Sequence, residues 1–314
     1  MAGKTPGVSA LPDLTTRLGS LTLQSPLVLA ASPWGSEAAR LAASGIGALT
    51  LNSVGPEPRK GHPEPTLYDW GGGLINAVGL ANTGAAAAVP LLREMKAQLA
   101  HQNVVLFASI FADTVEGYAQ VARTIAAAEP ALVEVNLSCP NVRGEFGIPF
   151  ASQASTAAEA TAAARGELKC PISVKLAPNV PELTPIAEAV VEAGADLITV
   201  SNTMPGMVID VETRRPVISN KTGGISGEAL RPIAVRMVYE LYEAVHVPII
   251  GTGGVVHGLD AVEMVMAGAT AVGLATVAHR HGWGGLRRVL GELDEWMSTH
   301  GVSKLEEIRG CAHG

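Results

Sequence analysis

The chain has 314 residues, of which 47% are hydrophobic, 16% charged and 4% aromatic, with a formal net charge of −7. This balance favours a large aliphatic core and excludes a disordered or fibrous chain. There is no dense lysine and arginine patch for nucleic acid, and no apolar run of about 18 residues that would span a membrane. The three cysteines have no metal-ligand spacing and the N-terminus has no apolar signal core, which predicts a cytoplasmic enzyme without a metal site.

Short β-branched runs alternate with longer helical segments along almost the whole chain, and continuous apolar runs are typical of buried parallel strands. The predicted strands are Pro26–Ala31, Gly45–Leu51, Val104–Ile110, Leu132–Leu137, Ile172–Leu176, Leu197–Ser201, Val247–Gly251 and Ala271–Ala275. The predicted helices include Thr114–Ala128, Pro181–Glu192, Gly227–Ala244 and Asp260–Ala267. This α/β alternation predicts a (β/α)8 TIM barrel that forms one domain over residues 1–314, and an open doubly wound sheet is the alternative.

Three segments interrupt the alternation. Leu14–Leu23 is predicted to form a hairpin across Gly19-Ser20 that closes the floor of the barrel. Ser53–Gly84 is rich in glycine and proline and has no clear helix, and a loop of this length in a compact domain is usually functional or disordered. Val142–Ser152 is a third irregular segment and a candidate lid. We expect the two later segments to lie over the C-terminal face of the barrel.

Two carboxamides and a thiol follow the strand Leu132–Leu137, in the sequence Asn136-Leu-Ser-Cys-Pro-Asn141. An asparagine side chain both donates and accepts hydrogen bonds, so Asn136 and Asn141 can bind the amide edge of a planar heterocycle. A thiol whose pKa is lowered can act as nucleophile or proton acceptor, which makes Cys139 a candidate for either role. Polar groups at the carboxyl end of a strand are typical of active sites in α/β folds.

Glycine clusters lie at the ends of the last three predicted strands. Gly251-Thr-Gly-Gly-Val255 follows the seventh strand, Gly273-Leu-Ala-Thr276 closes the eighth, and Gly223-Gly-Ile-Ser-Gly227 is expected to open the helix after the sixth. Loops after the last two strands of such barrels commonly bind phosphate through backbone N–H groups, and glycine permits close approach. The clusters therefore predict a phosphate site, with tight turns alone as the alternative.

Lys175 is the only cation inside a predicted apolar strand. Buried lysines are rare unless they pair with an anion or an electron-rich ligand, and in a flavin site such a cation can stabilise negative charge on the reduced ring. The alternative is a structural lysine that reaches solvent or pairs with Glu134. Asn76 and Asn202-Thr203 are expected at the same barrel mouth. Single asparagines are more often turn formers, but several together favour recognition of a polar planar ring.

Several motifs, in their order and spacing, resemble those of the class 1 dihydroorotate dehydrogenases, and most of all the catalytic subunit of the type B enzymes. The resemblance runs from about Leu14 to about His300. The motifs are Asn76-Ala-Val-Gly-Leu80, Asn136-Leu-Ser-Cys-Pro-Asn141, Val174-Lys-Leu-Ala-Pro-Asn179, Asn202-Thr203, Asn220-Lys-Thr-Gly-Gly-Ile-Ser-Gly227 and Gly251-Thr-Gly-Gly-Val255.

The resemblance implies an FMN-dependent oxidation of dihydroorotate to orotate in pyrimidine biosynthesis. Cys139 would take the proton from C5 of the substrate, while a hydride passes from C6 to N5 of FMN. The substrate would be held by Asn76, Val78, Gly79, Leu80, Asn136, Asn141, Asn202 and Thr203. FMN would be held by Ala31, Ser32, Asn52, Ser53, Ser109, Asn136, Lys175, Ser201, Gly227, Gly253, Gly254, Ala275 and Thr276. The implied partner is a separate subunit with FAD and an iron–sulfur cluster, and the assembly would be a homodimer or a hetero-oligomer.

Two positions depart from the family pattern. The family usually has a lysine at the end of the second strand that contacts flavin and substrate, whereas this chain has Asn52-Ser53-Val54. Loss of a buried cation removes a charge-assisted hydrogen bond of about 1.5–3 kcal/mol. The third strand usually ends in an asparagine near the flavin, and here Ser109 takes its place. Two alternatives stay open: an FMN-dependent oxidoreductase of another dihydropyrimidine-like ring, and a flavin-binding protein that has lost turnover.

Overall fold

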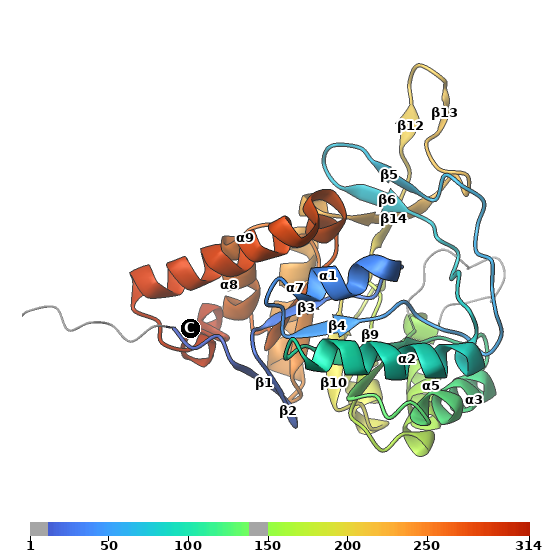
Figure 1. Cartoon of the computed structure of the whole chain (residues 1–314), viewed down its shortest axis with the longest axis horizontal. Helices are drawn as coiled ribbons and strands as arrows, with labels where there is room; N and C mark the ends of the chain where they lie inside the picture. Colours follow the sequence, from blue (N-terminus) through green and yellow to red (C-terminus); the bar gives the residue numbers. More distant parts are fainter. Residues whose placement is uncertain (1–11, 138–149) are drawn as a thin grey trace, which may run out of the picture.

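Eight parallel strands close into a barrel in the computed structural model, which describes residues 12–137 and 150–314 (Figure 1). The barrel strands are β3 (Leu27–Leu29), β4 (Ala48–Thr50), β7 (Val105–Ile110), β8 (Leu132–Asn136), β9 (Ile172–Lys175), β10 (Leu197–Val200), β15 (Ile249–Thr252) and β16 (Ala271–Leu274). Each strand pairs with its neighbours in chain order, and β16 pairs with β3 to close the ring. The predicted TIM barrel is therefore confirmed, and the open doubly wound sheet is excluded.

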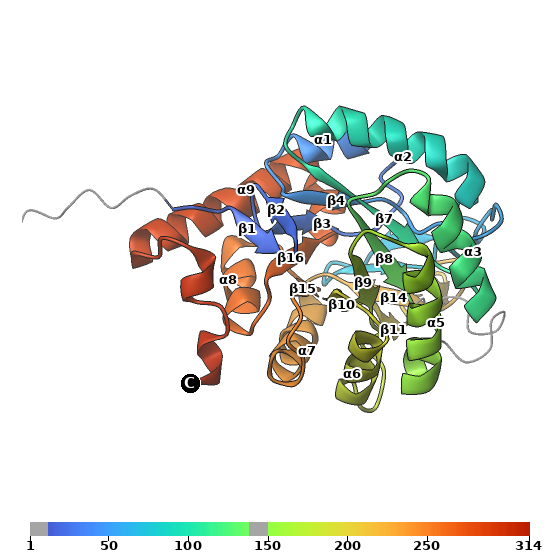
Figure 2. The same ribbon diagram turned by 90° about the horizontal axis from the view of Figure 1, so that it is seen from below.

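A helix follows every barrel strand, and the helices form a ring around the strands (Figure 2). They are α1 (Ala38–Ala42), α2 (Ala85–Ala100), α3 (Val115–Ala126), α5 (Ala154–Glu167), α6 (Thr184–Glu192), α7 (Arg231–Ala244), α8 (Gly258–Met266) and α9 (Thr276–His300). In α3 the Thr114 hydroxyl accepts the N–H of Gly117 and caps the first turn, while Tyr118, Val121 and Ile125 are buried at helical spacing. No helix in the described ranges has both the length and the apolar character needed to cross a membrane.

An antiparallel hairpin of β1 (Thr16–Leu18) and β2 (Leu21–Leu23) closes the amino-terminal end of the barrel. Leu18 and Leu23 are fully buried and pack against side chains from the barrel interior, including Phe107 and Leu132. The interior of such a barrel is a packed core and not a pore, so this floor leaves only the opposite end open for a site. The predicted hairpin is confirmed.

A second sheet, in the order β11-β14-β6-β5, is built from two loops over the carboxyl ends of the barrel strands (Figure 1). β5 (Leu67–Asp69) and β6 (Leu74–Asn76) come from the loop after β4, and β11 (Met204–Gly206) and β14 (Gly223–Ser226) come from the loop after β10. Beyond it, β12 (Ile209–Asp210) and β13 (Arg215–Pro216) form a small hairpin at the tip of the molecule in Figure 1.

The second sheet adds strands that the sequence did not predict. The segment Ser53–Gly84 has no helix, as expected, but it contains β5 and β6. The first four residues of Gly223–Gly227 form β14, which pairs with β6 so that Gly224 lies opposite Asn76, and Gly227 lies directly before the 3-10 helix Glu228–Leu230 that continues into α7. These strands have only three or four residues each, and β6 and β14 lie far apart in sequence, so a local pattern could not show their pairing.

Candidate active site

Two cavities share a wall at the carboxyl ends of the barrel strands. The larger has a volume of about 510 Å³ and the smaller about 80 Å³. The predicted residues that line the larger cavity are Ala31, Ser32, Asn52, Ser53, Asn76, Val78, Gly79, Leu80, Asn136, Lys175, Asn202, Thr203 and Ala275. Those that line the smaller cavity are Ala31, Lys175, Ser201, Asn202, Thr203, Gly227, Gly253, Gly254, Ala275 and Thr276. Residues far apart in sequence thus meet at one mouth.

Among the described residues, Ser109 is the predicted site residue that lines neither cavity. Cys139 and Asn141 lie outside the described residues, as do residues 142–149 of the candidate lid. The described end of that segment is a short 3-10 helix, Phe150–Ser152. Ser109 is buried behind the wall of the larger cavity, where its hydroxyl lies 2.8 Å from the Ser53 hydroxyl.

A chain of buried polar side chains runs beneath the larger cavity. The Nδ2 of Asn136 donates to the Ser53 hydroxyl at 3.1 Å, and the Ser109 hydroxyl donates to Oε1 of Glu134 at 3.1 Å. Because a hydroxyl has only one proton, the Ser53 hydroxyl must be the donor to Ser109. Glu134 also lies 3.6 Å from Nζ of Lys175. The chain therefore links a carboxamide that lines the cavity to a buried ion pair.

Lys175 lies against both cavities and is also part of that ion pair. Its side chain is 7% exposed and that of Glu134 is 6% exposed, so neither charge is solvated as in water. The pairing with Glu134 is the structural alternative considered from the sequence, and it is confirmed. Pairing does not take the lysine away from the site, because Lys175 lines the larger cavity whereas Glu134 lies behind it.

The two positions that depart from the family pattern are held by different contacts. Asn52 donates through Nδ2 to the backbone oxygen of Ala81 at 2.7 Å, which fixes its carboxamide at the edge of the larger cavity. Ser109 contacts Ser53, the residue after Asn52 in sequence. The end of the second barrel strand and the end of the third therefore belong to one set of hydrogen bonds.

The segment Asn76–Leu80 forms one wall of the larger cavity with an unusual backbone. Gly79 and Leu80 both have positive φ angles, of 72° and 58°. A Cβ on Gly79 would lie 2.7 Å from the backbone nitrogen of His62, so this position requires glycine. Arg59 donates through Nε to the Gly79 oxygen at 2.8 Å and holds the turn. A left-handed non-glycine residue such as Leu80 typically marks a functional segment.

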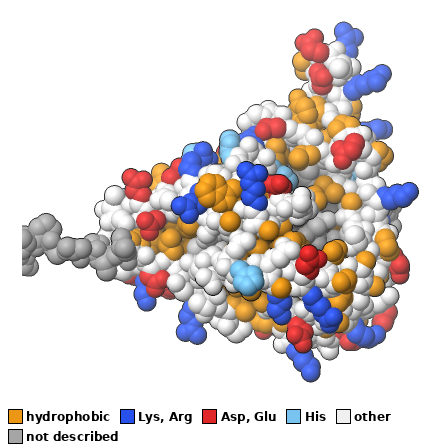
Figure 3. All heavy atoms as spheres, viewed as in Figure 1, with side chains coloured by type: hydrophobic (Ala, Val, Ile, Leu, Met, Phe, Trp, Pro, Cys, Tyr) orange, Lys and Arg blue, Asp and Glu red, His pale blue; other side chains and the backbone are white. Residues whose placement is uncertain are grey.

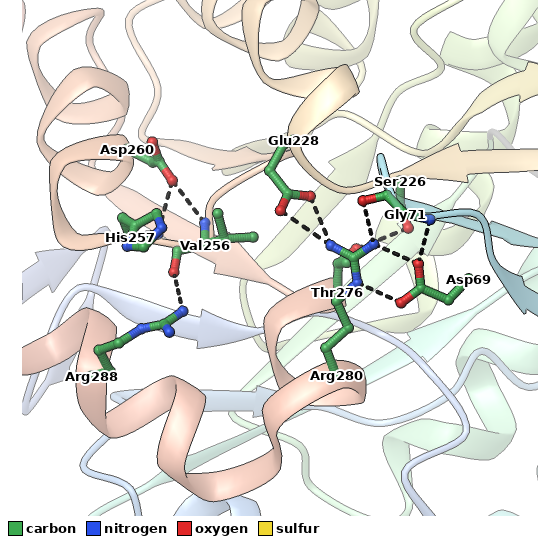
Figure 4. A network of polar contacts seen from close by, with 10 residues as sticks. All are labelled: Asp69, Gly71, Ser226, Glu228, Val256, His257, Asp260, Thr276, Arg280 and Arg288. Carbon is green, nitrogen blue, oxygen red and sulfur yellow. Dashed lines mark hydrogen bonds and ion pairs between the residues drawn. The ribbon is translucent and has the colours of Figure 1, made fainter.

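Glycines of the turn after β15 line one side of the smaller cavity. Gly253 and Gly254 have φ angles of 142° and 78°, and a Cβ on Gly254 would overlap the backbone of Arg231. Asp260 accepts the N–H groups of Val256 and His257 at 2.9 and 2.8 Å, so the first turn of α8 holds the loop in place (Figure 4). A rigid turn of glycines before a helix is typical of phosphate sites.

One buried hydroxyl in the smaller cavity has no hydrogen-bond partner among the described residues. It is Oγ1 of Thr252, at the end of β15. Thr252 lies opposite Gly273 in the neighbouring strand, and a side chain at 273 would overlap this hydroxyl, so glycine leaves the space open. Buried hydroxyl groups usually have a partner, which makes Thr252 a candidate to bind a polar ligand group. Thr252 was not predicted from the sequence, although its inward direction follows from the buried Ile250 two positions earlier.

Arg280 in α9 joins the second sheet to the barrel (Figure 4). It contacts the carboxylate of Asp69 in β5 at 2.6 Å and that of Glu228 at 3.1 Å. Hydrogen bonds from Arg280 and from the N–H of Gly71 lower the pKa of Asp69 to about 2. In the same helix, Thr276 donates to the Ser226 hydroxyl at 2.9 Å. The sequence analysis did not single out Arg280, because its partners lie on segments remote in sequence.

His279, also in α9, lines the larger cavity and was not predicted either. Its Nε2 lies 2.9 Å from the Ser32 hydroxyl, and its ring stacks on Trp34 with centroids 4.5 Å apart. Burial lowers the pKa of His279 below its usual value of 6.5, which favours the neutral ring at pH 7. His279 therefore adds an aromatic, hydrogen-bonding wall and not a cation.

The outer surface shows no large area of one charge on the face in Figure 3, where basic and acidic side chains are interspersed. The fold is that of a (β/α)8-barrel protein, with a polar cavity beside a glycine-rich turn at the carboxyl ends of its strands. The family model described as "Dihydroorotate dehydrogenase" matches residues 13–297. The chain belongs to the dihydroorotate dehydrogenase family, a family of oxidoreductases, and the resemblance seen in the motifs is confirmed.

Similar proteins named "Dihydroorotate dehydrogenase B (NAD(+)), catalytic subunit" occur in bacteria and archaea. The protein of Desulforudis audaxviator is 39% identical over 94% of this chain and 96% of its own length. That of Pelobacter propionicus is 37% identical over 96% of this chain and 98% of its own length. That of Methanocaldococcus jannaschii is 35% identical over 96% of this chain and 98% of its own length. The similarity thus extends over nearly the whole of each chain.

Proposed function

We propose that this chain catalyses the FMN-dependent oxidation of dihydroorotate to orotate. The observation that carries the proposal is the meeting, at one barrel mouth, of a carboxamide-lined cavity and a glycine-built turn. Membership of the dihydroorotate dehydrogenase family supports the reaction. A polar planar substrate fits the first feature, and a phosphorylated cofactor fits the second.

The two cavities fit FMN in size and in chemistry. The larger cavity alone, at about 510 Å³, is within the range of about 300–1,000 Å³ that is usual for small-molecule sites. The unpaired Thr252 hydroxyl and the backbone of Gly253 and Gly254 suit the ribityl phosphate. Lys175 lines both cavities and suits the electron-rich edge of the flavin ring. FMN would supply the acceptor for a hydride from the substrate.

The protein's own contribution to the reaction would be orientation and proton transfer. Asn76, Asn136, Asn141 and Asn202 would hold the pyrimidine through paired donors and acceptors. Cys139 would accept the C5 proton on its Sγ and act as the general base. The buried hydrogen-bond chain that ends at Asn136 would keep that carboxamide in one orientation, because its Nδ2 is already committed to Ser53.

A second candidate function is the oxidation of a related dihydropyrimidine that has no carboxylate. The observation that favours it is the charge of the larger cavity. Among the described residues that line it, Lys175 is the only lysine or arginine, and Lys175 is paired with Glu134. Asn52 is neutral and already donates to Ala81, while Glu64 adds a negative charge to the wall. An anionic substrate therefore finds less compensation here than the family pattern provides.

We further propose that a separate subunit takes the electrons from this chain. The relatives are named catalytic subunits of an NAD(+)-dependent enzyme, which implies another component. An iron–sulfur cluster is commonly held by four cysteines, and this chain has only three, at distant positions. FAD and the cluster would therefore be carried by the partner, in a hetero-oligomer or around a homodimer of this chain.

Anaerobic addition of dihydroorotate to the FMN-loaded protein tests the proposal. Rapid bleaching of the flavin absorbance is expected, because reduction removes the absorbance of the oxidised ring. Bleaching by dihydrouracil but not by dihydroorotate would favour the second candidate. If dithionite bleaches the flavin but neither dihydroorotate nor dihydrouracil does, both candidate functions are contradicted. That result would indicate a flavin-binding protein without turnover.

A further inference from the structure

Glu134 is a buried acid to which the proposed reaction gives no role. It lies in β8 with its side chain in the barrel interior, and 6% of that side chain is exposed. It accepts the Ser109 hydroxyl at 3.1 Å and lies 3.6 Å from Nζ of Lys175. A buried carboxylate is costly unless it is paired and hydrogen-bonded, so both contacts are needed to keep it in place.

The geometry separates the two charges with respect to the site. Lys175 lines both cavities, whereas Glu134 lines neither and lies behind the lysine. A ring bound in the larger cavity would therefore contact the ammonium group of Lys175 directly. The carboxylate of Glu134 would affect the ring only through its interaction with that ammonium group. Charges at this depth interact more strongly than at the surface, because little water screens them. The ring would experience a lysine whose charge is partly compensated.

The carboxylate is held on its other side by the hydroxyl chain. Ser109 is bonded to Ser53, and Ser53 accepts Nδ2 of Asn136. Register places Glu134 opposite Ser173, two residues before Lys175 in β9, and Asn136 opposite Lys175. The two charges thus lie diagonally across adjacent barrel strands, so their mutual geometry is set by the barrel and not by a loop.

We propose that Glu134 is a positioning residue that fixes Lys175 against the cofactor and, through its negative charge, holds the reduction potential of the bound flavin at a more negative value. The inference rests on the proposed FMN function. A flavin gains negative charge on reduction, and Lys175 stabilises that charge. Glu134 opposes this stabilisation, because it offsets the lysine.

Three substitutions at one position test this role. Glu134→Gln keeps the hydrogen-bonding shape without the charge, Glu134→Met removes both, and Glu134→Asp keeps the charge. Each protein is loaded with FMN and reduced anaerobically at neutral pH against a reference dye, without any pyrimidine. In the Gln and Met variants we expect a less negative potential, equivalent to about a tenfold or greater gain in the affinity for reduced over oxidised FMN. The Asp variant should stay near the wild type.

Ser173→Ala is the matched control. Ser173 is in the same strand as Lys175 and lies opposite Glu134 in β8, and its hydroxyl is bonded to that of Thr199, so its loss perturbs the packing without changing a charge. Its potential should equal that of the wild type. A wild-type potential in the Gln and Met variants, or equal shifts in the Asp and Gln variants, would overturn the role of the charge.

The experiment separates this inference from the proposed function. If the variants show the expected potentials but dihydroorotate does not bleach the flavin, the inference stands and dihydroorotate is refuted as the substrate. Normal bleaching by dihydroorotate with unchanged potentials would uphold the function and refute the inference. A wild-type protein that takes up no FMN would refute both.

Discussion

The two cavities at the barrel mouth are built from different chemical groups. The larger one is lined by side chains with specific donors and acceptors, among them Asn52, Asn76, Asn136 and Asn202. The smaller one includes Gly227, Gly253 and Gly254, which offer only backbone groups, and the Thr252 hydroxyl, which has no partner among the described residues. A side-chain site can change its ligand by substitution, whereas a backbone site keeps its ligand as long as the turn keeps its shape.

The departures from the family pattern follow this division. Asn52 lines the larger cavity and Ser109 lies directly behind its wall, while the glycine motif of the smaller cavity is intact. Ser109, at the end of the third barrel strand, is bonded to Ser53, which follows Asn52 at the end of the second. The two departures from the family pattern therefore lie next to one shared hydrogen bond. The cofactor end is therefore expected to behave like that of the family, and the substrate end is where this chain differs.

The largest expected effect tests the substrate end. Cys139→Ala should keep FMN bound but slow reduction by dihydroorotate by about 100-fold or more, the usual scale for loss of a general base. Stopped-flow measurement of the flavin absorbance gives this rate. Cys170→Ala is the matched control, since burial raises the pKa of the Cys170 thiol and makes it a poor base. Unchanged reduction in the Cys139 variant would exclude it as the base.

A substitution at the second strand tests whether the substrate end lacks a cation. Asn52→Lys should tighten orotate binding by about tenfold or more, because a charge-assisted hydrogen bond contributes about 1.5–3 kcal/mol. Perturbation of the flavin spectrum on titration with orotate measures the affinity. Asn52→Ala removes the bond to Ala81 without adding charge, and it should not tighten binding. Equal affinity in the Lys variant and the wild type would show that this position does not face the carboxylate.

A matched substitution at the cofactor end should have a smaller effect. Thr252→Val removes one hydroxyl and keeps the side-chain shape, so FMN affinity should fall about two- to tenfold, as for one hydrogen bond of about 0.5–1.5 kcal/mol. Quenching of FMN fluorescence on binding measures it. In Thr161→Val, which loses a buried bond to Ala157 in α5, FMN affinity should not change. Tighter binding in the Thr252 variant would mean that the hydroxyl is not a ligand.

The barrel was predictable because its strands are continuous apolar runs. All eight predicted ranges contain the observed strands, apart from Thr252, which extends the seventh by one residue. The second sheet was not predictable, because its strands are short, β14 carries two glycines, and β6 and β14 pair between distant loops. Strand propensity is context-dependent, and here the context is another loop.

Site residues could be predicted where the position of a residue in a strand alone decides which way its side chain points. Polar residues at strand ends, such as Asn136 and Lys175, converge because the carboxyl ends of parallel strands meet at one face. Most contacts between side chains were not predicted: the pairing of Lys175 with Glu134 was considered, but the bond between Ser53 and Ser109 was not. His279 and Arg280 were missed for the same reason, because their partners lie on remote segments.

The smallest expected effect concerns the ion pair between Arg280 and Asp69, which joins α9 of the barrel to β5 of the second sheet. Asp69→Asn should lower the melting temperature slightly at neutral pH, because half-exposed ion pairs contribute little. The folded pKa of Asp69 is about 2 and the usual value is 3.8, so the carboxylate stabilises the fold above pH 3.8 and loses this effect as the pH falls toward 2. The difference between wild type and variant in thermal melts should narrow over this window. A difference that stays constant down to pH 2 would show that the charge of Asp69 does not hold the second sheet.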